Sequence, residues 1–492
     1  MKNIQYILLL IISVSLFSCS DFLNEDPYYV VTTDNAISTL DKAKAAVGSS
    51  YATLEGDAWG GGLYVAQASK SGFVNWRIAD YEMSYSQTEN APGVANYWKA
   101  FYTTLNRANF AIYGIPRLDE SLVGDGTERD ALLAEARCLR AWAHINILWN
   151  FGHWWADDSD EFGLLYHDEM SDLSNIVKER INVGDSYKYI LEDLDFAIEN
   201  LKSYSTPKYI SVEFAKALKA KILLYRGAYN NVNDIPALTE ALGLINEVLS
   251  SSAAGLGMSE NLKSVFDESW NSTENLFTNY LGDYSQGKRG PASGEYYRNT
   301  VIGNGDGKPY PAAADRTAGL NYGVDLFKAD PRWNVVTGYC WGSTGKAWSW
   351  SKVSRVASAA QGGTYEDYAS YYLRYAELYI MKAELLARTG ASISEAIAPI
   401  NTMRSKRTNP VLSDLNPTTN EELMDAIFYE YFFETFLENG SEFFASLRFH
   451  KNGAQWIETI KGEGLIENKL CWPIPNEEMI TNELMKQNPD LN

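Results

Sequence analysis

Residues 132–152 read LLAEARCLRAWAHINILWNFG, and the spacing of apolar residues in this stretch decides the fold. Apolar residues recur every three or four positions, which is typical of one face of an α-helix. One stripe is Leu132, Ala136, Leu139, Ala143 and Ile147, and a second is Ala134, Cys138, Ala141, Ile145 and Leu148. Two apolar stripes predict a helix that packs between neighbouring helices, and the alanines let those neighbours come close.

The same periodicity continues on the C-terminal side of this stretch. It predicts further helices over 187–201, 214–229, 376–387, 393–400 and 423–431. Ser211 is a suitable N-cap for the second of these, and Pro399 should kink the fourth. Small residues recur where paired helices would touch, as in tetratricopeptide-like stacks, although no strict repeat of about 34 residues is visible. We therefore expect degenerate helical repeats over about 97–250 and 371–450, stacked into a curved layer.

Two long segments, about 56–96 and 270–370, do not follow this pattern. They are rich in Gly, Ser, Asn, Tyr and Trp and contain turn-forming pairs such as Gly303-Asn304 and Gly362-Gly363. Loops of this length are uncommon in compact domains unless they carry function or form small strands of their own. The predicted fold class is mainly α, with tetratricopeptide-like helical repeats and an irregular, loop-rich, ligand-binding half that contains a few short strands.

Composition narrows the possible functions. The chain has 492 residues, is 46% hydrophobic, and carries 42 basic against 63 acidic residues, a net charge of −21. An acidic surface repels phosphate backbones, so we expect no nucleic-acid partner. The cysteines and the four histidines show no metal-ligand spacing, and we expect no metal site and no cofactor. Three of the four cysteines (Cys138, Cys340 and Cys471) are predicted to be small buried residues.

The N-terminus is typical of an exported bacterial lipoprotein. Lys2 precedes an apolar run from Ile7 to Phe17, which is too short to span a bilayer. The run ends at Ser18-Cys19, a small residue before a cysteine, as in a lipobox. An ordinary signal peptide with a chance cysteine is the alternative. We expect residues 1–18 to be a lipoprotein signal peptide, Cys19 to be lipidated, and residues 19–492 to form one domain.

The irregular segments carry many aromatic residues. Sugar rings have an apolar face that stacks on flat aromatic side chains, while neighbouring polar groups bond the hydroxyls. The candidate ligand-binding residues are Trp76, Tyr81, Tyr85, Trp341 and Trp348. Packing against the helical layer is the competing interpretation for each single ring, because large aromatics are mostly buried. Trp98 lies on a helical pattern and is assigned to packing.

No catalytic residue can be nominated. Glu430, Glu434 and Glu438 form a row at helical spacing, but glycosidase carboxylates flank a bond from opposite sides. Salt bridges are the expected role of this row. The sequence contains no nucleophile elbow, Walker loop or zinc-protease helix, and we expect a protein that is not an enzyme. A glycoside hydrolase stays open as an alternative because these enzymes share no universal motif.

Several segments together resemble the SusD/RagB family of outer-membrane nutrient-binding lipoproteins. The resemblance covers nearly all of the chain after Cys19 and is most specific in the C-terminal half. The similar segments are Cys19-Ser20-Asp21-Phe22-Leu23, residues 97–109, residues 135–152, Leu373-Arg374-Tyr375-Ala376-Glu377, Asn401-Thr402-Met403-Arg404, Pro473-Ile474-Pro475-Asn476-Glu477-Glu478 and Gln487-Asn488-Pro489. The acidic residues after Cys19 also resemble the surface-export signals of Bacteroidetes lipoproteins.

The resemblance implies a cell-surface protein, lipid-anchored in the outer membrane, whose helical repeats dock on a SusC-like TonB-dependent transporter. It implies a non-enzymatic role in which the irregular half captures an oligosaccharide for nutrient uptake. Capture of peptides, as in RagB-like relatives, is the alternative within the family. None of the family's ligand residues aligns by motif, so the candidate residues stand on physical grounds alone.

The chain departs from the family pattern near residue 440. Tyr431 stands where a basic residue is usual, and Glu442 and Ala445 stand where the family usually shows Arg and Asp. Arg448 is retained. These changes predict a weaker salt-bridge network in this region without a change of fold.

Overall fold

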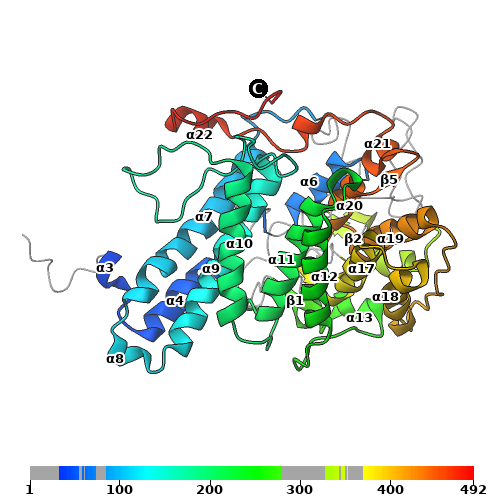
Figure 1. Ribbon diagram of the computed structural model, residues 1–492, viewed down its shortest axis with the longest axis horizontal. Coiled ribbons are helices and arrows are strands. Elements are labelled where there is room, and N and C mark those ends of the chain that lie inside the picture. The colour runs from blue at the N-terminus through cyan, green and yellow to red at the C-terminus, as the bar shows by residue number, and fades with distance from the viewer. Residues whose placement is uncertain are drawn as a thin grey trace, which may run out of the picture.

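Nine long helices lie side by side across the described part of the molecule (Figure 1). The computed structural model describes residues 33–54, 58–59, 61–73, 85–278, 327–342, 345–349, 352 and 369–491. The nine helices are α4 (Leu40–Tyr51), α7 (Pro92–Gly114), α9 (Thr127–Phe151), α10 (Val183–Asn200), α11 (Val212–Gly227), α12 (Ile235–Leu249), α17 (Tyr375–Arg388), α18 (Ile393–Lys406) and α19 (Asn420–Thr435). From α9 through α10, α11, α12, α17 and α18 each packs on the next, which confirms the predicted tetratricopeptide-like stacking.

Helix α9 lies between α7 and α10, and both of its predicted stripes are buried. Its few charged residues are also paired: Arg137 Nε and Arg140 Nε each donate to the Asp193 carboxylate of α10 at 2.7 Å. The helix ends at Gly152, whose backbone N–H donates to Leu148 O. The double periodicity of residues 132–152 therefore identified the central helix correctly.

The helix boundaries follow local capping. Ser211 Oγ accepts a hydrogen bond from Phe214 N at 3.2 Å, which confirms the predicted N-cap of α11. Ser392 and Thr419 begin α18 and α19 with capping boxes, in which a glutamate three residues later bonds back to the cap. Helix α18 continues past Pro399.

Three short antiparallel pairs of strands accompany the helices. Strand β1 (Asn275–Thr278) pairs with β4 (Tyr371–Arg374), β2 (Gly338–Gly342) with β3 (Gly345–Ser349), and β5 (His450–Lys451) with β6 (Ala454–Gln455). The first pair joins the beginning and the end of the predicted irregular segment 270–370. The expected few short strands are confirmed.

The first irregular segment, 56–96, is predicted incorrectly in part. Residues Gly62–Lys70 form helix α6, and every residue of it is buried. Trp59, which precedes it, is also fully buried, and its Nε1 donates to Thr104 Oγ1 at 3.1 Å. The glycines before the helix indicated a loop, whereas Gly61 (φ 107°) only provides the turn into α6.

Residues 470–491 lie across the ends of the N-terminal helices (red in Figure 1). Trp472 N donates to Asn150 O at 2.7 Å, and Asn488 Nδ2 donates to Phe151 O at 3.0 Å. The two family-like segments also bond each other, because Gln487 Oε1 accepts from Ile474 N at 2.8 Å. These contacts give a physical reason for the family-like sequence here.

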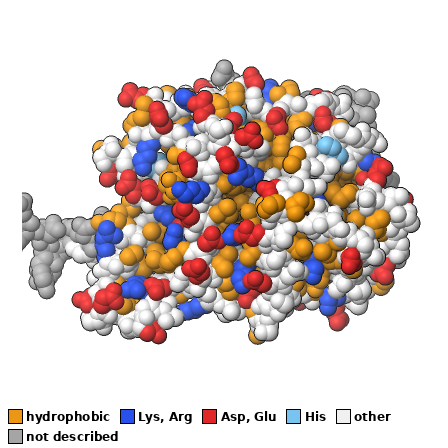
Figure 2. Space-filling model, in the orientation of Figure 1, with side chains coloured by type: hydrophobic (Ala, Val, Ile, Leu, Met, Phe, Trp, Pro, Cys, Tyr) orange, Lys and Arg blue, Asp and Glu red, His pale blue; other side chains and the backbone are white. Residues whose placement is uncertain are grey.

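The other helical elements are short. They are α3 (Thr33–Ala36), η1 (Ile115–Arg117), α8 (Glu120–Val123), η2 (Tyr229–Asn231), α13 (Leu262–Asp267), η3 (Ser269–Asn271), α16 (Trp333–Val336), α20 (Ser441–Arg448), α21 (Trp456–Lys461), η6 (Glu467–Lys469) and α22 (Asn476–Thr481). None of the helices in the described ranges combines the length and the apolar character needed to cross a membrane. Acidic and basic side chains are interspersed on the visible face (Figure 2).

Candidate functional site: an aromatic hairpin held by buried ion pairs

Strands β2 and β3 form a hairpin, Gly338–Ser349, that carries two of the predicted ligand-binding residues. The backbone register pairs Tyr339 with Trp348 and Trp341 with Lys346. Paired positions, and every second position along a strand, belong to the same face of an antiparallel ladder. Positions 339, 341, 346 and 348 therefore share one face. We call this segment the aromatic hairpin.

The sequence analysis named Trp341 and Trp348 but missed Tyr339. The available signal was the alternation of Tyr339 and Trp341 before two glycines, Gly342 and Gly345, a sequence pattern that is typical of a hairpin. The structure thus brings two candidates onto one ladder and adds a third aromatic position to their face.

Two basic residues bracket the aromatic hairpin, and both are buried. Arg332, at the start of α16, has an exposed fraction of 0%, and Lys352 has one of 1%. Lys352 N donates to Val336 O at 3.3 Å. This hydrogen bond joins the segments directly before and directly after the hairpin, which we call its feet. Both side chains reach carboxylates on α19 or in the turn that follows it.

Arg332 makes a bidentate ion pair with Glu430, through Nη1 to Oε2 and Nη2 to Oε1, both at 3.0 Å. Its Nη1 also lies 3.2 Å from Glu434 Oε2, and its Nε donates to Asp330 Oδ1 at 2.8 Å. Lys352 Nζ donates to Glu438 Oε1 at 2.9 Å. The carboxylates of Glu430, Glu434 and Glu438 therefore bond basic side chains on both sides of the hairpin.

The remaining members of this cluster come from distant parts of the chain. Arg374 of β4 donates to Glu438 Oε2 at 2.7 Å and to Glu274 Oε2 at 2.6 Å. Arg407 also pairs with Glu274 and Glu434, and Arg404 pairs with Glu430. We call the whole group the ion-pair cluster; its described members are Arg332, Lys352, Arg374, Arg404 and Arg407 with Glu274, Asp330, Glu430, Glu434 and Glu438.

The ion-pair cluster confirms the expected salt-bridge role of the glutamate row. Burial alone would raise the pKa of Glu434, but Arg407, Arg374 and Arg332 outweigh it and hold that pKa well below its usual value. Glu434 is therefore a permanent carboxylate near neutral pH and cannot donate a proton as a glycosidase acid must.

The predicted weakening of the salt-bridge network near residue 440 does not extend to the glutamate row, although Glu442 itself makes no ion pair among the described residues. Arg448 Nη2 still bonds Glu384 Oε2 at 2.9 Å. The partners of the glutamate row come from positions 332, 352, 374, 404 and 407, so the loss of basic residues at 431 and 442 leaves the row fully paired. Sequence spacing could not reveal partners that lie up to about a hundred residues away.

Of the other three candidate residues, the structure describes Tyr85. Tyr85 is buried, with an exposed fraction of 8%, and Lys461 Nζ lies 3.6 Å from its ring centroid. Burial, aided by Glu463, raises the pKa of Tyr85 above its usual value. One face of its ring is thus covered by an ammonium group, contrary to the expectation of an exposed ring. Trp76 and Tyr81 lie outside the described residues. Trp98 is buried, which confirms its assignment to packing.

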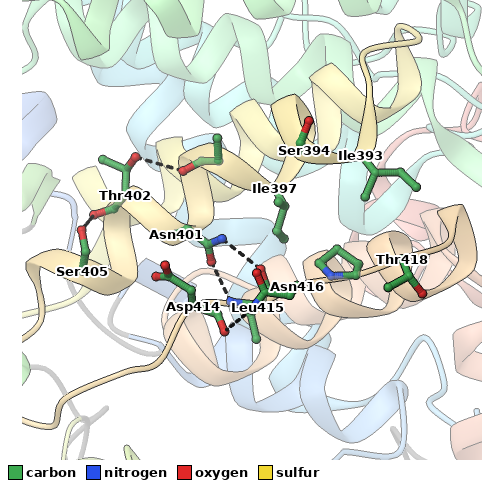
Figure 3. A pocket seen from close by; sticks show the side chains of 12 residues that line it. Ile393, Ser394, Ile397, Asn401, Thr402, Ser405, Asp414, Leu415, Asn416 and Thr418 are labelled. Carbon is green, nitrogen blue, oxygen red and sulfur yellow. Dashed lines mark hydrogen bonds between the residues drawn. The ribbon is translucent and has the colours of Figure 1, made fainter.

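An open groove of about 810 Å³ runs between α18 and residues 414–418 (Figure 3). Its lining is mainly aliphatic, hydroxyl and amide, with Asp414 as the one charged side chain among the lining residues. Asn401 ties the two walls together, because its amide bonds Leu415 O and Leu415 N at 2.9 and 2.8 Å. None of the described residues that line the groove is aromatic, so these residues offer no stacking surface for a sugar.

The described residues offer no group of three or more His, Cys, Asp or Glu side chains placed to hold a metal ion. Cys138 and Cys471 are buried free thiols, as predicted for these two residues. Burial raises the pKa of the Cys471 thiol to about 11, so it stays protonated at neutral pH.

Comparisons with known proteins agree with the fold. The profile of the SusD family matches residues 334–490. A SusD-like protein of Bacteroides ovatus is 25% identical over 193 residues, which are 39% of this chain and 33% of that protein. SusD-like protein P38 of Formosa agariphila is 22% identical across 99% of both chains.

Solved structures show the same architecture. A SusD superfamily protein from Bacteroides thetaiotaomicron superposes with a TM-score of 0.69 at 18% identity, over 92% of this chain and 100% of that one. A laminarin-binding SusD-like protein gives 0.65 at 19% identity, over 92% and 100%. A protein solved with a xylogluco-oligosaccharide gives 0.64 at 17% identity, over 89% and 97%. The helical layer, the match of the SusD family profile in its C-terminal third and these relatives together show that the chain is similar to proteins of the SusD/RagB family.

Proposed function

We propose that this chain is a cell-surface glycan-binding lipoprotein that captures an oligosaccharide and passes it to a SusC-like TonB-dependent transporter. The observation that carries the proposal is the placement of positions 339, 341 and 348 on one face of the aromatic hairpin. Three neighbouring aromatic residues suit the apolar faces of successive sugar rings. The glycan ligands of the two structural relatives, laminarin and a xylogluco-oligosaccharide, support this class of ligand.

The proposal includes a lipid anchor at Cys19, which lies outside the described residues. Removal of residues 1–18 and acylation of Cys19 would tether the chain to the outer membrane, on the exterior of the cell. More than one acyl chain gives stable anchoring without any inserted protein segment. Labelling with a radioactive or clickable palmitate, lost in Cys19→Ala, tests the anchor.

Calorimetry with a panel of oligosaccharides tests the ligand class, and laminarin and xyloglucan fragments belong in that panel. We expect Trp341→Ala and Trp348→Ala each to weaken binding by about 10- to 100-fold, as removal of a central aromatic contact does. Tyr209→Ala is a matched control, because Tyr209 is an exposed aromatic residue on a different part of the chain. Trp76 and Tyr81 are proposed as further contacts and take the same test.

Two results would replace the proposal by another function. Binding of peptides and of no glycan would indicate RagB-like peptide capture. Release of shorter products from a glycan by the purified chain, abolished by one Asp or Glu substitution, would indicate a glycoside hydrolase.

A further inference from the structure

A small cavity lies inside the molecule, where helices α6, α9 and α11 meet β4 and α20. Its volume is about 30 Å³, and none of the residues that line it is more than 7% exposed. A cavity needs roughly 10–15 Å³ to hold a water molecule, so this one has room for a water but not for a sugar ring. Half of its lining side chains are aromatic: Tyr64, Trp142, Trp149, Phe214, Tyr372 and Phe444.

Gln67 of α6 lines the cavity and carries an unsatisfied acceptor. Its Nε2 donates to Asn150 Oδ1 at 3.0 Å, and Asn150 Nδ2 donates to Asn146 O at 2.7 Å. These two bonds fix which end of each amide is the donor. Gln67 Oε1 is left without a hydrogen-bond partner among the described residues, although the side chain is almost fully buried. Buried acceptors of this kind are nearly always bonded to protein or to ordered water.

Trp149 of α9 lines the same cavity and carries an unsatisfied donor. Its indole Nε1–H has no partner among the described residues, and the residue is 6% exposed. The ring packs against Tyr225 and Phe444, whose centroids lie 5.3 and 5.2 Å from its own. An indole N–H can only donate. The cavity is therefore lined by one side chain that lacks a donor and by another that lacks an acceptor.

Asn439 and Lys221, which also line the cavity, already have partners. Asn439 Nδ2 donates to Tyr372 O at 3.2 Å and to Glu377 Oε2 at 2.6 Å. Lys221 Nζ lies 2.9 Å from Glu377 Oε1 and donates to Ser441 Oγ at 3.1 Å. The ammonium group of Lys221 would repel a cation bound beside it. A ligand of this cavity should therefore be uncharged.

We propose that the cavity binds an ordered water molecule, which donates to Gln67 Oε1 and accepts from Trp149 Nε1–H. Water fits the volume, is neutral, and both donates and accepts hydrogen bonds. A monovalent cation could bond the oxygen of Gln67 but would leave the indole N–H unsatisfied. The water joins α6 to α9, whether or not the chain binds a glycan.

A crystal structure of the purified full chain tests this site, at a resolution at which ordered waters are seen. We expect density for a water molecule in the cavity, within about 2.7–3.2 Å of both Gln67 Oε1 and Trp149 Nε1. An empty cavity, or one closed by movement of its walls, would overturn the proposal. So would a water molecule that fails to bond both atoms. The parent chain alone decides this test, so its result does not require that any variant folds.

Two variants test the bridge in the same crystals. Gln67→Met keeps the length of the side chain and removes the acceptor, and Trp149→Phe removes the donor. The water density at this position should be lost in both. Trp98→Phe is the matched control and should keep the water, because Trp98 is a buried tryptophan that does not line the cavity. Density that is unchanged in both Gln67→Met and Trp149→Phe would overturn the proposal.

Nuclear magnetic resonance tests the site in solution. In a chain labelled with nitrogen-15 at its tryptophan indoles, the Nε1 proton of Trp149 is the signal that Trp149→Phe lacks. This proton should show cross-relaxation with a bound water, and the effect should be lost in Gln67→Met. No cross-relaxation with water at this proton in the parent chain would overturn the proposal.

Crystals soaked in rubidium chloride distinguish water from a cation. Water density in the cavity without an anomalous signal from rubidium supports the proposal. A rubidium signal between Gln67 and Trp149 would show a cation site and would overturn it.

Discussion

The helical layer around α9 and the ion-pair cluster at the feet of the aromatic hairpin are both buried, but different forces hold them. In α9 the contacts are mainly apolar, as with Leu139 and Ile145, whose exposed fraction is 0%. At the hairpin the contacts at 332 and 352 are charged. Apolar contacts adapt when one atom is lost, whereas a buried ion pair that loses one partner leaves a bare charge. The difference predicts how each region responds to mutation and to pH.

The largest expected effect belongs to Arg374, which bonds three glutamates of the ion-pair cluster (Glu274, Glu434 and Glu438). Arg374→Met should lower the free energy of unfolding by about 3–5 kcal/mol, because it leaves buried carboxylates short of a partner. Urea unfolding followed by circular dichroism measures this. Lys263→Met is the matched control, since it breaks a pair whose members are 59% and 42% exposed. A loss no larger than that of the control would contradict the comparison.

Removing apolar volume from the helical layer should have the next largest effect. Leu139→Ala leaves a cavity in the middle of α9, and we expect a loss of about 3 kcal/mol in the free energy of unfolding. The same substitution at Leu173, which is 93% exposed, should change stability little and serves as the control. Because the substitution changes no charge, this loss should be insensitive to salt and to pH.

The two regions should depend on pH in opposite directions. In the loop between α9 and α10, which packs on α7 of the helical layer, burial lowers the pKa of His167 to about 4 from an ordinary 6.5. Its contribution to stability is therefore present above pH 6.5 and is lost as the pH falls. Near the hairpin, burial raises the pKa of Glu442 to about 7 from an ordinary value near 4.5, so its contribution to folding stability is lost as the pH rises through 7. His167→Gln should reduce the dependence of the unfolding free energy on pH between 6 and 5 by about 1 kcal/mol per pH unit. Unfolding titrations at several pH values test this, and an unchanged slope would show that His167 titrates normally.

The smallest effect on stability is expected for an ion pair that is exposed to solvent. Lys216 of α11 pairs with Glu247 of α12 at 2.7 Å, and the glutamate side chain is 58% exposed. Lys216→Met should change the free energy of unfolding by about 0.5 kcal/mol or less, because water solvates the glutamate that remains. A loss comparable to that of Arg374→Met would mean that burial does not explain the difference between the two regions.

Helices could be predicted from the sequence where buried apolar residues recur with helical spacing. Three predictions were correct: the buried stripes of α9, the N-cap at Ser211 and the salt-bridge role of the glutamates at 430, 434 and 438. Each depends on residues within a few turns of one another, so local spacing contains the information.

The errors have the opposite cause. Helix α6 is buried on all sides and so has no polar face to produce a periodic signal, and the glycines before it indicated a loop. The partners of Glu430 and Glu438, Arg332 and Lys352, come from a segment far away in the sequence, and no local pattern marks them. The covered ring of Tyr85 depends on Lys461 in the same way. In the candidate site, aromatic residue types were predictable, while the structures that hold or cover them were not.

The contacts of residues 470–491 also have a consequence for the order of folding. The carbonyls of Asn150 and Phe151, at the C-terminal end of α9, are bonded by Trp472 and Asn488, more than three hundred residues later in the chain. Such long loops are slow to close, because the entropy of closure must be lost before the contacts form. While the chain is being made, the N-terminal helices therefore lack part of their native hydrogen bonding. Native bonding at this end of α9 is complete only after the C-terminal segment has been synthesised.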